Sequence, residues 1–246
     1  IQETTKEKIS AVVVSHDCEG IIAQLKGLDF DEIYAVKTDK DYAFQDDAVS
    51  QVVADMIRTI DPSSVLVPAT IIGRSIFSRV AAKLGCGLTA DCTELLVGTK
   101  EDGSYYIKQN KPSFGENVFV TIVTKDNVYP QMMTVRPGVY QPFEGTTEKE
   151  PEVKYLEVEV PESKVKVVEK RPAASNADSI LAAETVVVGG RGTESEESFR
   201  LLKEFADSLD AAIGGTRPLV DTGFIPFEHQ IGQTGYTIRP RICLSF

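Results

Sequence analysis

The sequence predicts an α/β fold in two domains, and three observations support this prediction. Strand-like and helix-like segments alternate over residues 11–84, the pattern of a mostly parallel sheet with flanking helices. Several strand-like segments follow without helices between them, and these are expected to add antiparallel members to the sheet of the first domain. A stretch of small and polar residues then precedes a second run of strand, glycine-rich turn and helix.

Each strand and helix expected over residues 11–84 is predicted from a local sequence pattern. Short apolar runs predict buried strands, and apolar residues that recur at helical spacing predict amphipathic helices. The longest helix is expected to end at Asp61-Pro62, because proline cannot continue a helix. The expected strands are Ala11–Val14, Ile33–Val36 and Ser64–Pro68, and the expected helices are Ile21–Leu25, Asp46–Ile60 and Gly73–Leu84.

Strand-like segments dominate after Gly85. The acidic and polar residues Gln141–Val153 predict a surface loop within this part. We place a domain boundary near residue 172, which gives a first domain of residues 1–171 and a second of residues 172–246. The expected strands are Tyr105–Lys108, Val118–Thr124, Met132–Val135 and Tyr155–Val160, with a further one at Val165–Glu169.

The second domain begins with the apolar run Thr185–Val188, which predicts a buried strand and leads directly into Gly189-Gly-Arg-Gly192. A helix is expected from Ser195 to Ile213 because apolar residues recur on one face. We expect Gly214-Gly215 to end this helix, where a residue with positive φ is needed.

Composition excludes several functions. The 246 residues carry 26 Lys+Arg against 37 Asp+Glu, a net charge of −11, which argues against a nucleic-acid surface. No apolar run reaches about 18 residues, so no membrane-spanning helix is expected. The four cysteines form no CxxC pair and there are only two histidines, so we predict no metal site and a cytoplasmic location.

Gly189-Gly-Arg-Gly192 is the motif most typical of ligand binding. A glycine-rich turn between a strand and a helix lets backbone N–H groups approach an anion, and Arg191 can grip a phosphate with two hydrogen bonds. The motif is neither GxGxxG nor a P-loop. A tight turn that needs its glycines for backbone geometry remains the alternative interpretation.

Two further loops follow in the second domain. Thr216 and Arg217 lie in Gly214-Gly-Thr-Arg-Pro218 and can face a ligand at the carboxyl end of a strand; the alternative is a helix cap with a surface arginine. Ile231-Gly-Gln-Thr-Gly235 can present an amide, a hydroxyl and free N–H groups to a polar heterocycle; the alternative is a plain β-turn.

Taken in this order, the three loops resemble the flavin domain of the electron-transfer flavoprotein alpha subunit, bacterial and anaerobe type. Segments of the first domain are similar to the same family. They are Ala69-Thr-Ile-Ile-Gly-Arg74, Arg79-Val-Ala-Ala-Lys-Leu84, Gly87-Leu-Thr-Ala-Asp-Cys92, Lys111-Pro-Ser-Phe-Gly-Glu-Asn117 and Thr134-Val-Arg-Pro-Gly138. Family members extend further at both ends, so we expect this chain to be truncated at both ends and to hold the N-terminal half of an FAD-binding domain.

The resemblance implies FAD as the cofactor and assigns roles to single residues. Arg191 would serve the FAD phosphates, Thr216 would supply a hydroxyl contact, and Arg217 would lie against the isoalloxazine. Thr234 would reach the flavin N5 edge with its hydroxyl. The remaining implied cofactor-binding residues are Ile231, Gly232, Gln233 and Gly235.

The resemblance implies an electron carrier rather than an enzyme. It would pair with a beta subunit and shuttle electrons from flavin dehydrogenases of the acyl-CoA dehydrogenase type, as in fatty acid β-oxidation, to the respiratory chain or other acceptors. Electron bifurcation from NADH is a further possibility in the anaerobe branch. Two other hypotheses stay open: an adenine-nucleotide-binding enzyme of the α-hydrolase type, and a scaffold whose first domain only grips a partner.

Overall fold

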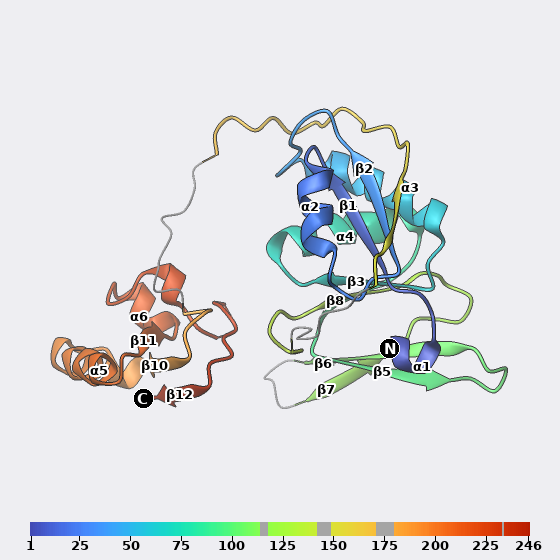
Figure 1. The fold of residues 1–246 in the computed structure, drawn as a ribbon. Helices are drawn as coiled ribbons and strands as arrows, with labels where there is room; N and C mark the ends of the chain where they lie inside the picture. The colour runs from blue at the N-terminus through green and yellow to red at the C-terminus, as the bar shows by residue number, and fades with distance from the viewer. Residues whose placement is uncertain (114–117, 142–148, 171–179, 233) are drawn as a thin grey trace. The chain divides into compact units, whose positions relative to one another are not determined.

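The computed structural model describes residues 1–246 apart from 114–117, 142–148, 171–179 and 233. The chain divides into two compact units, Ile1–Glu169 and Lys170–Phe246, which we describe separately. Both units combine parallel sheets with helices (Figure 1), so the predicted α/β class is confirmed.

The first unit contains most of the regular structure. Its helices are α1 (Gln2–Thr5), α2 (Cys18–Leu25), α3 (Asp46–Ile60) and α4 (Ile71–Leu84). Its strands are β1 (Ser10–Ser15), β2 (Glu32–Lys37), β3 (Ser64–Pro68), β4 (Leu88–Cys92), β5 (Glu94–Thr99), β6 (Tyr105–Pro112), β7 (Phe119–Ile122), β8 (Gln131–Val135) and β9 (Glu152–Tyr155).

The parallel strands β1, β2 and β9 form a sheet with β2 in the centre. Alternate side chains of a strand point to opposite faces, and the two faces are covered by different helices. Val13 and Ile33 pack with Ile22 of α2 on one face, whereas Val36 packs with Val52 of α3 on the other. Helices therefore pack on both faces of the sheet, as is usual for parallel sheets.

A second parallel sheet has the order β3–β8–β4, and α3 and α4 pack together over it. Helix α4 begins where the Thr70 hydroxyl accepts a hydrogen bond from the Gly73 N–H at 3.0 Å, and it ends at Gly85 in the left-handed conformation. Strands β5, β6 and β7 form a separate antiparallel sheet.

The first unit corrects several expectations about its strands. The segment expected at Met132–Val135 is not an antiparallel addition, because it forms β8, the central strand of one parallel sheet. The strand expected at Tyr155–Val160 is misplaced: residues 156–160 form no strand, and β9, which ends at Tyr155, is a parallel edge strand of the other sheet. Strand β9 also begins within the segment expected to be a loop, and no strand forms at residues 165–169. Strands β4 and β5 were not predicted: β4 has no continuous apolar run, and that of β5 is limited to the three residues 95–97.

The second unit is a smaller parallel sheet. Its elements are β10 (Thr185–Gly189), η1 (Arg191–Thr193), α5 (Glu196–Ser208), β11 (Ala212–Gly215), α6 (Arg217–Asp221), η2 (Phe227–His229) and β12 (Ile242–Ser245). The strand order is β11–β10–β12, and both pairings are parallel (Figure 1). Val187 of β10 packs against Leu202 and Ala206 of α5 in the core.

Helix α5 is shorter than predicted. It ends at Ser208, and the residue with positive φ is Asp210 (+50°), not Gly214 or Gly215. Residues 212–215 instead form β11, which pairs with β10. Position 214 requires glycine for steric reasons, because a Cβ there would lie 2.2 Å from Cδ1 of Ile231.

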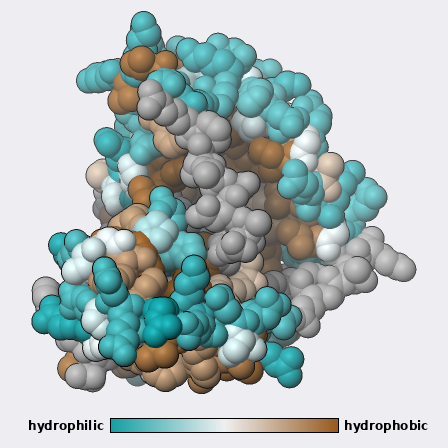
Figure 2. All heavy atoms as spheres, turned by 90° about the vertical axis from the view of Figure 1, so that its left-hand side faces the viewer, coloured by the Kyte–Doolittle hydropathy of each residue, from teal (hydrophilic) through white to brown (hydrophobic). Residues whose placement is uncertain are grey.

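The described surface is mixed in character. Hydrophobic residues lie between hydrophilic ones on the face drawn in Figure 2. Among the described residues, no helix combines the length and the apolar character needed to cross a membrane.

Candidate functional site

The carboxyl ends of three parallel strands meet at one edge of the second unit. The Gly190 N–H, just after β10, donates a hydrogen bond of 2.7 Å to the carbonyl of Phe246, just after β12. The Thr216 N–H, just after β11, donates one of 2.9 Å to the carbonyl of Gly189. Open α/β sheets bind ligands in the crevice outside such strand ends. This edge is therefore the candidate functional site.

The first loop at this edge is the turn after β10. Arg191 begins the short helix η1, and the Thr193 hydroxyl closes the turn by donating 2.8 Å to the carbonyl of Gly190. Arg191 is exposed and forms no ion pair within the part of the chain that the structure describes. Its guanidinium is available to an anion.

The glycines of this turn leave room beside the backbone. A Cβ at Gly192 would meet no atom within 4 Å, so the space next to η1 is open. A Cβ at Gly190 would lie 3.0 Å from the Phe246 carbonyl oxygen and 3.9 Å from the Thr216 hydroxyl. Gly190 therefore allows the ends of all three strands to approach one another.

The second loop follows β11. Thr216 precedes α6, and Arg217 is its first residue. The Arg217 Nε atom donates to the Asp221 carboxylate at 3.2 Å, with both side chains about two-thirds exposed. Exposed pairs four residues apart on a helix contribute only about 0.3–0.5 kcal/mol. The Arg217 guanidinium can therefore turn to another anionic partner at little cost.

The third loop is held against the end of β11 and forms a β-turn. The Ile231 N–H donates to the Gly215 carbonyl at 2.8 Å, and the Gly235 N–H donates to the Gly232 carbonyl at 3.0 Å. Gly232 has a φ angle of +113°, which favours glycine. The turn leaves Thr234 exposed, whereas Gln233 lies outside the described residues.

The geometry thus brings the three sequence motifs to one edge of one sheet. The first and second loops meet through Gly189, Gly190 and Thr216, and the second and third through Gly215 and Ile231. The groups they offer are two guanidinium cations and two hydroxyls. Such a donor set suits an anionic ligand that is rich in hydrogen-bond acceptors.

Two residues next to the third loop were not singled out from the sequence as binding residues. Gln230 is 3% exposed, and its Nε2 atom donates to the Thr234 hydroxyl at 2.9 Å. The Nδ1 atom of His229 lies 2.7 Å from the Ile213 carbonyl oxygen. The only sequence feature that could have pointed to these two residues is their position directly before Ile231. Glutamine and histidine are not residue types from which burial is predicted.

In two of the first-unit segments that resemble the family, Ala69–Arg74 and Gly87–Cys92, polar side chains have partners within the unit. Thr70 caps α4 with its hydroxyl, and Asp91 receives two hydrogen bonds from Arg136, at 3.1 Å to Oδ1 and 2.7 Å to Oδ2. These hydrogen bonds hold the pKa of the Asp91 carboxyl below its usual range. A carboxylate at the strand ends disfavours a phosphate there.

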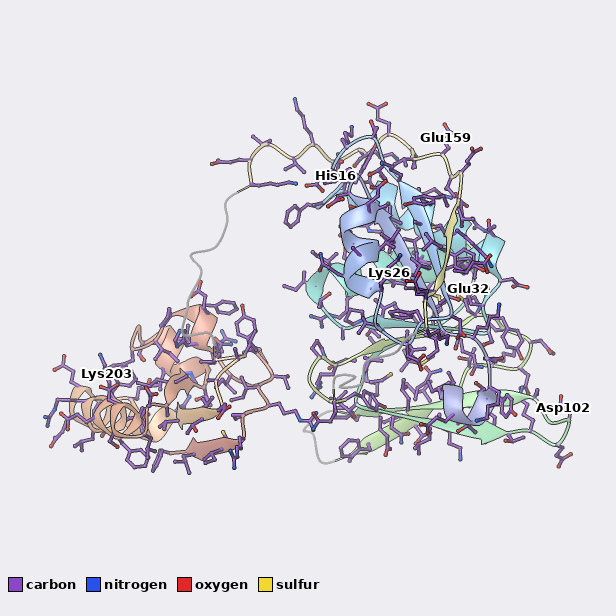
Figure 3. The ribbon with its side chains drawn as sticks, in the orientation of Figure 1. His16, Lys26, Glu32, Asp102, Glu159 and Lys203 are labelled. Atoms are coloured by element: carbon purple, nitrogen blue, oxygen red, sulfur yellow. The ribbon has the colours of Figure 1, made fainter. Side chains whose placement is uncertain are left out.

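The two histidines lie in separate surroundings. His16 is exposed in the first unit, just beyond the carboxyl end of β1 (Figure 3). His229 belongs to the second unit. Within the described ranges, no group of three or more His, Cys, Asp or Glu side chains is arranged to hold a metal ion.

Comparison with known proteins gives two matches that together span most of the chain. Residues 1–162 match the family model described as the electron transfer flavoprotein domain, and residues 179–246 match the electron transfer flavoprotein FAD-binding domain. The chain belongs to the electron transfer flavoprotein alpha subunit family. Members of this family are electron carriers rather than enzymes, and their alpha subunits pair with beta subunits.

The sequences of individual relatives support this family assignment. The electron transfer flavoprotein subunit alpha of Thermoanaerobacterium thermosaccharolyticum is 32% identical over 96% of this chain and 71% of its own. That of Megasphaera elsdenii is 34% identical over 100% of this chain and 72% of its own. A subunit of Acetobacterium woodii named lactate dehydrogenase (NAD(+),ferredoxin) subunit LctC is 36% identical over 80% of this chain and 46% of its own.

The residues at the edge of the second unit fit the cofactor that the electron transfer flavoprotein family implies. FAD carries a negatively charged diphosphate and a flavin ring with several acceptors. The open space beside Gly192, together with the Arg191 cation, suits the diphosphate. The hydroxyl proton of Thr234, an exposed residue, and the Arg217 cation, which is held only by a weak surface ion pair, suit acceptor atoms of the ring.

Proposed function

We propose that this chain is the FAD-holding subunit of an electron carrier, with the cofactor at the carboxyl edge of the β11–β10–β12 sheet. The observation that carries the proposal is the meeting of all three loops at that edge through the hydrogen bonds of Gly190, Thr216 and Ile231. The match of residues 179–246 to an FAD-binding domain supports the same cofactor.

Each loop has its own task in this proposal. Arg191 and the open backbone around Gly192 bind the diphosphate, and Thr216 adds a hydroxyl contact. Arg217 lies against the flavin ring and favours the negative charge that reduction adds, because opposite charges attract strongly in a partly desolvated site. The Thr234 hydroxyl donates to the N5 edge. Ile231, Gly232, Gln233 and Gly235 shape the loop that presents Thr234.

When bound, FAD would supply the redox chemistry. The chain contributes binding, orientation and charge. No substrate bond is made or broken in this role. Electrons enter from one protein partner and leave to another.

We further propose that the chain works as a dimer with a beta subunit and receives electrons from flavin dehydrogenases of the acyl-CoA dehydrogenase type. The family of the chain supports the beta subunit as partner. The name of the Acetobacterium woodii relative joins NAD(+) and ferredoxin, which makes NADH a second electron source to test, with bifurcation as the corresponding mode.

The decisive experiment is to purify the natural protein together with its beta subunit and to measure bound flavin by its visible spectrum and by mass spectrometry. We expect FAD in the assembled dimer, and weaker FAD binding in Arg191→Ala. The control is Arg200→Ala, which removes an exposed arginine of α5 outside the proposed site. A correctly assembled but colourless dimer would contradict the proposal.

The electron source can be identified with the same preparation. Reduction of the flavin by a substrate-reduced acyl-CoA dehydrogenase, with no reduction by NADH, supports simple carriage. Reduction by NADH alone supports the NAD-linked mode. If neither donor reduces the bound flavin, both proposed electron sources are wrong.

A further inference from the structure

The buried residue Gln230 forms a side-chain hydrogen bond with Thr234 of the third loop, the loop of Ile231–Gly235. Its Nε2 atom donates to the hydroxyl oxygen of Thr234 at 2.9 Å. Gln230 is 3% exposed, whereas Thr234 is exposed to solvent. The buried amide of Gln230 thus donates a hydrogen bond to the Thr234 hydroxyl, which belongs to the candidate site.

The backbone of Gln230 is fixed from both sides. Its N–H donates to the Phe227 carbonyl at 2.9 Å, and its carbonyl accepts from the Tyr236 N–H at 2.7 Å. It also forms a parallel bridge with Gly215 at the end of β11. Gln230 is therefore tied to the sheet edge, directly before Ile231 and Gly232 of the third loop.

Gly235 leaves room for Gln230. A Cβ at Gly235 would lie 2.3 Å from the Gln230 carbonyl oxygen and 2.9 Å from its Cγ atom. Only glycine allows this approach, although its φ angle is not positive. A side chain at position 235 would therefore displace the backbone and the side-chain stem of Gln230, which reaches Thr234.

The direction of the hydrogen bond decides what Thr234 can do. A threonine hydroxyl has one proton to donate and can accept two hydrogen bonds. Since the oxygen accepts from the Gln230 amide, its proton stays available to an acceptor outside the loop. If the partner at 230 were an acceptor, the proton would turn inward instead.

We propose that Gln230 is a positioning residue that makes Thr234 an outward hydrogen-bond donor. The inference rests on the proposed function, because the acceptor is the N5 edge of the flavin ring. It adds a residue that no loop motif contains, and it predicts that Gln230 acts on the flavin only through Thr234.

The experiment is a double-mutant cycle on the FAD-loaded dimer, read out as the two-electron midpoint potential of the flavin. Gln230→Met removes the donor without adding charge, and Thr234→Val removes the hydroxyl. Two-electron reduction places a proton on N5, so only the oxidised ring accepts a hydrogen bond there. We therefore expect Gln230→Met to weaken binding of oxidised relative to reduced flavin about tenfold, which raises the potential by about 30 mV. In the Thr234→Val background the same substitution should have less than a third of this effect.

Thr234→Ser is the matched control, because it keeps the hydroxyl and should keep the sensitivity to Gln230→Met. Gln230→Glu is a second variant for the case that Gln230→Met does not fold. Its carboxylate accepts the Thr234 proton and withdraws it from N5. The change in potential caused by Gln230→Glu should therefore be more positive in the presence of Thr234 than in the Thr234→Val background. The added charge acts directly on the flavin in both backgrounds, so the difference between the two backgrounds cancels this direct effect.

The outcomes separate this inference from the proposed function. A flavin-free wild-type dimer contradicts the proposed function, and this inference with it. Bound flavin whose potential responds to Thr234→Val but not to Gln230→Met contradicts only the role of Gln230. An equal response to Gln230→Met in both backgrounds would also overturn it, because Gln230 would then act by another route.

Discussion

The Nδ1 atom of His229 lies 2.7 Å from the carbonyl oxygen of Ile213 and thereby ties η2 to β11. Because a carbonyl only accepts, Nδ1 carries a proton, and the ring is fixed in that tautomer when neutral. The hydrogen bond lies immediately before the segment that carries Gln230 and the third loop. His229 is therefore part of the support of the candidate site.

We predict that His229→Leu lowers the free energy of unfolding of the second unit by about 1 kcal/mol, because the Ile213 carbonyl loses a partner. The Nδ2 atom of asparagine can take the place of Nδ1, so His229→Asn should lose less than half as much. Denaturant unfolding of both variants measures the difference. Equal losses in the two variants would show that the hydrogen bond contributes nothing.

Substitution of Arg217 should change the redox potential without changing the fold. Arg217→Ala removes a cation from beside the proposed flavin ring, so the reduced form should lose about 1.4 kcal/mol relative to the oxidised form. For a two-electron couple this lowers the midpoint potential by about 30 mV. The potential is measured in the flavin-loaded dimer by dye-coupled titration.

Arg200→Ala is the matched control for Arg217→Ala. Arg200 pairs with Glu204 four residues later at 3.1 Å, and Arg217 pairs with Asp221 at 3.2 Å with the same fractional exposure of 65%. Both substitutions remove one exposed cation and one ion pair. An unchanged or raised potential in Arg217→Ala, or an equal drop in both variants, would refute the role given to Arg217.

The first unit should lose stability in acid through Glu32. This nearly buried carboxylate accepts hydrogen bonds from Lys8 at 2.7 Å, Lys154 at 2.9 Å and Tyr34 at 2.9 Å. These donors, Lys8 first, lower its pKa from 4.5 to about 2. Because the folded pKa lies below the unfolded one, the stabilisation is present above pH 4.5 and is lost as the pH falls towards 2.

Glu32→Gln tests this pH dependence. We expect a loss of about 2 kcal/mol at neutral pH, because the amide cannot serve two ammonium groups, and a flatter profile between pH 4.5 and 2. Glu19→Gln is the control, since Glu19 also pairs with a lysine, at 2.8 Å, but is exposed. Parallel acid profiles for wild type and Glu32→Gln would show that another group dominates.

Gly73 should tolerate no side chain. A Cβ at this position in α4 would lie 2.2 Å from the carbonyl oxygen of Pro68, which belongs to the backbone and cannot rotate away. We predict a loss of about 3 kcal/mol for Gly73→Ala. For Gly87→Ala, where a Cβ would meet nothing within 4 Å, the change should stay within about 0.5 kcal/mol. Thermal unfolding of both variants provides the comparison.

The elements predicted best are those whose signal is local. The bounds of α3 agree with the prediction because its apolar stripe is long and Asp61-Pro62 ends it. Strand β11 was missed because its two glycines have low strand propensity, and its conformation comes from pairing with β10. The direction of β8 likewise depends on its neighbours β3 and β4, which no local pattern encodes.

The candidate site divides in the same way. Arg191, Arg217 and Thr234 lie in glycine-containing motifs that the sequence displays, whereas their meeting at one sheet edge follows from strand order. Gln230 could not be singled out, because a glutamine is ordinarily exposed. Its burial depends on the approach of Gly235 and on the bridge to Gly215.

The pairing of β10 with β12 has a consequence for the order in which the protein is made. The Gly190 N–H finds its partner at Phe246, and residues 191–245 lie between the two. During synthesis the glycine-rich turn therefore leaves the ribosome well before the strand that completes its surroundings. The first unit can therefore begin to fold before the hydrogen bond between Gly190 and Phe246 can form, because that bond requires β12 to have left the ribosome as well.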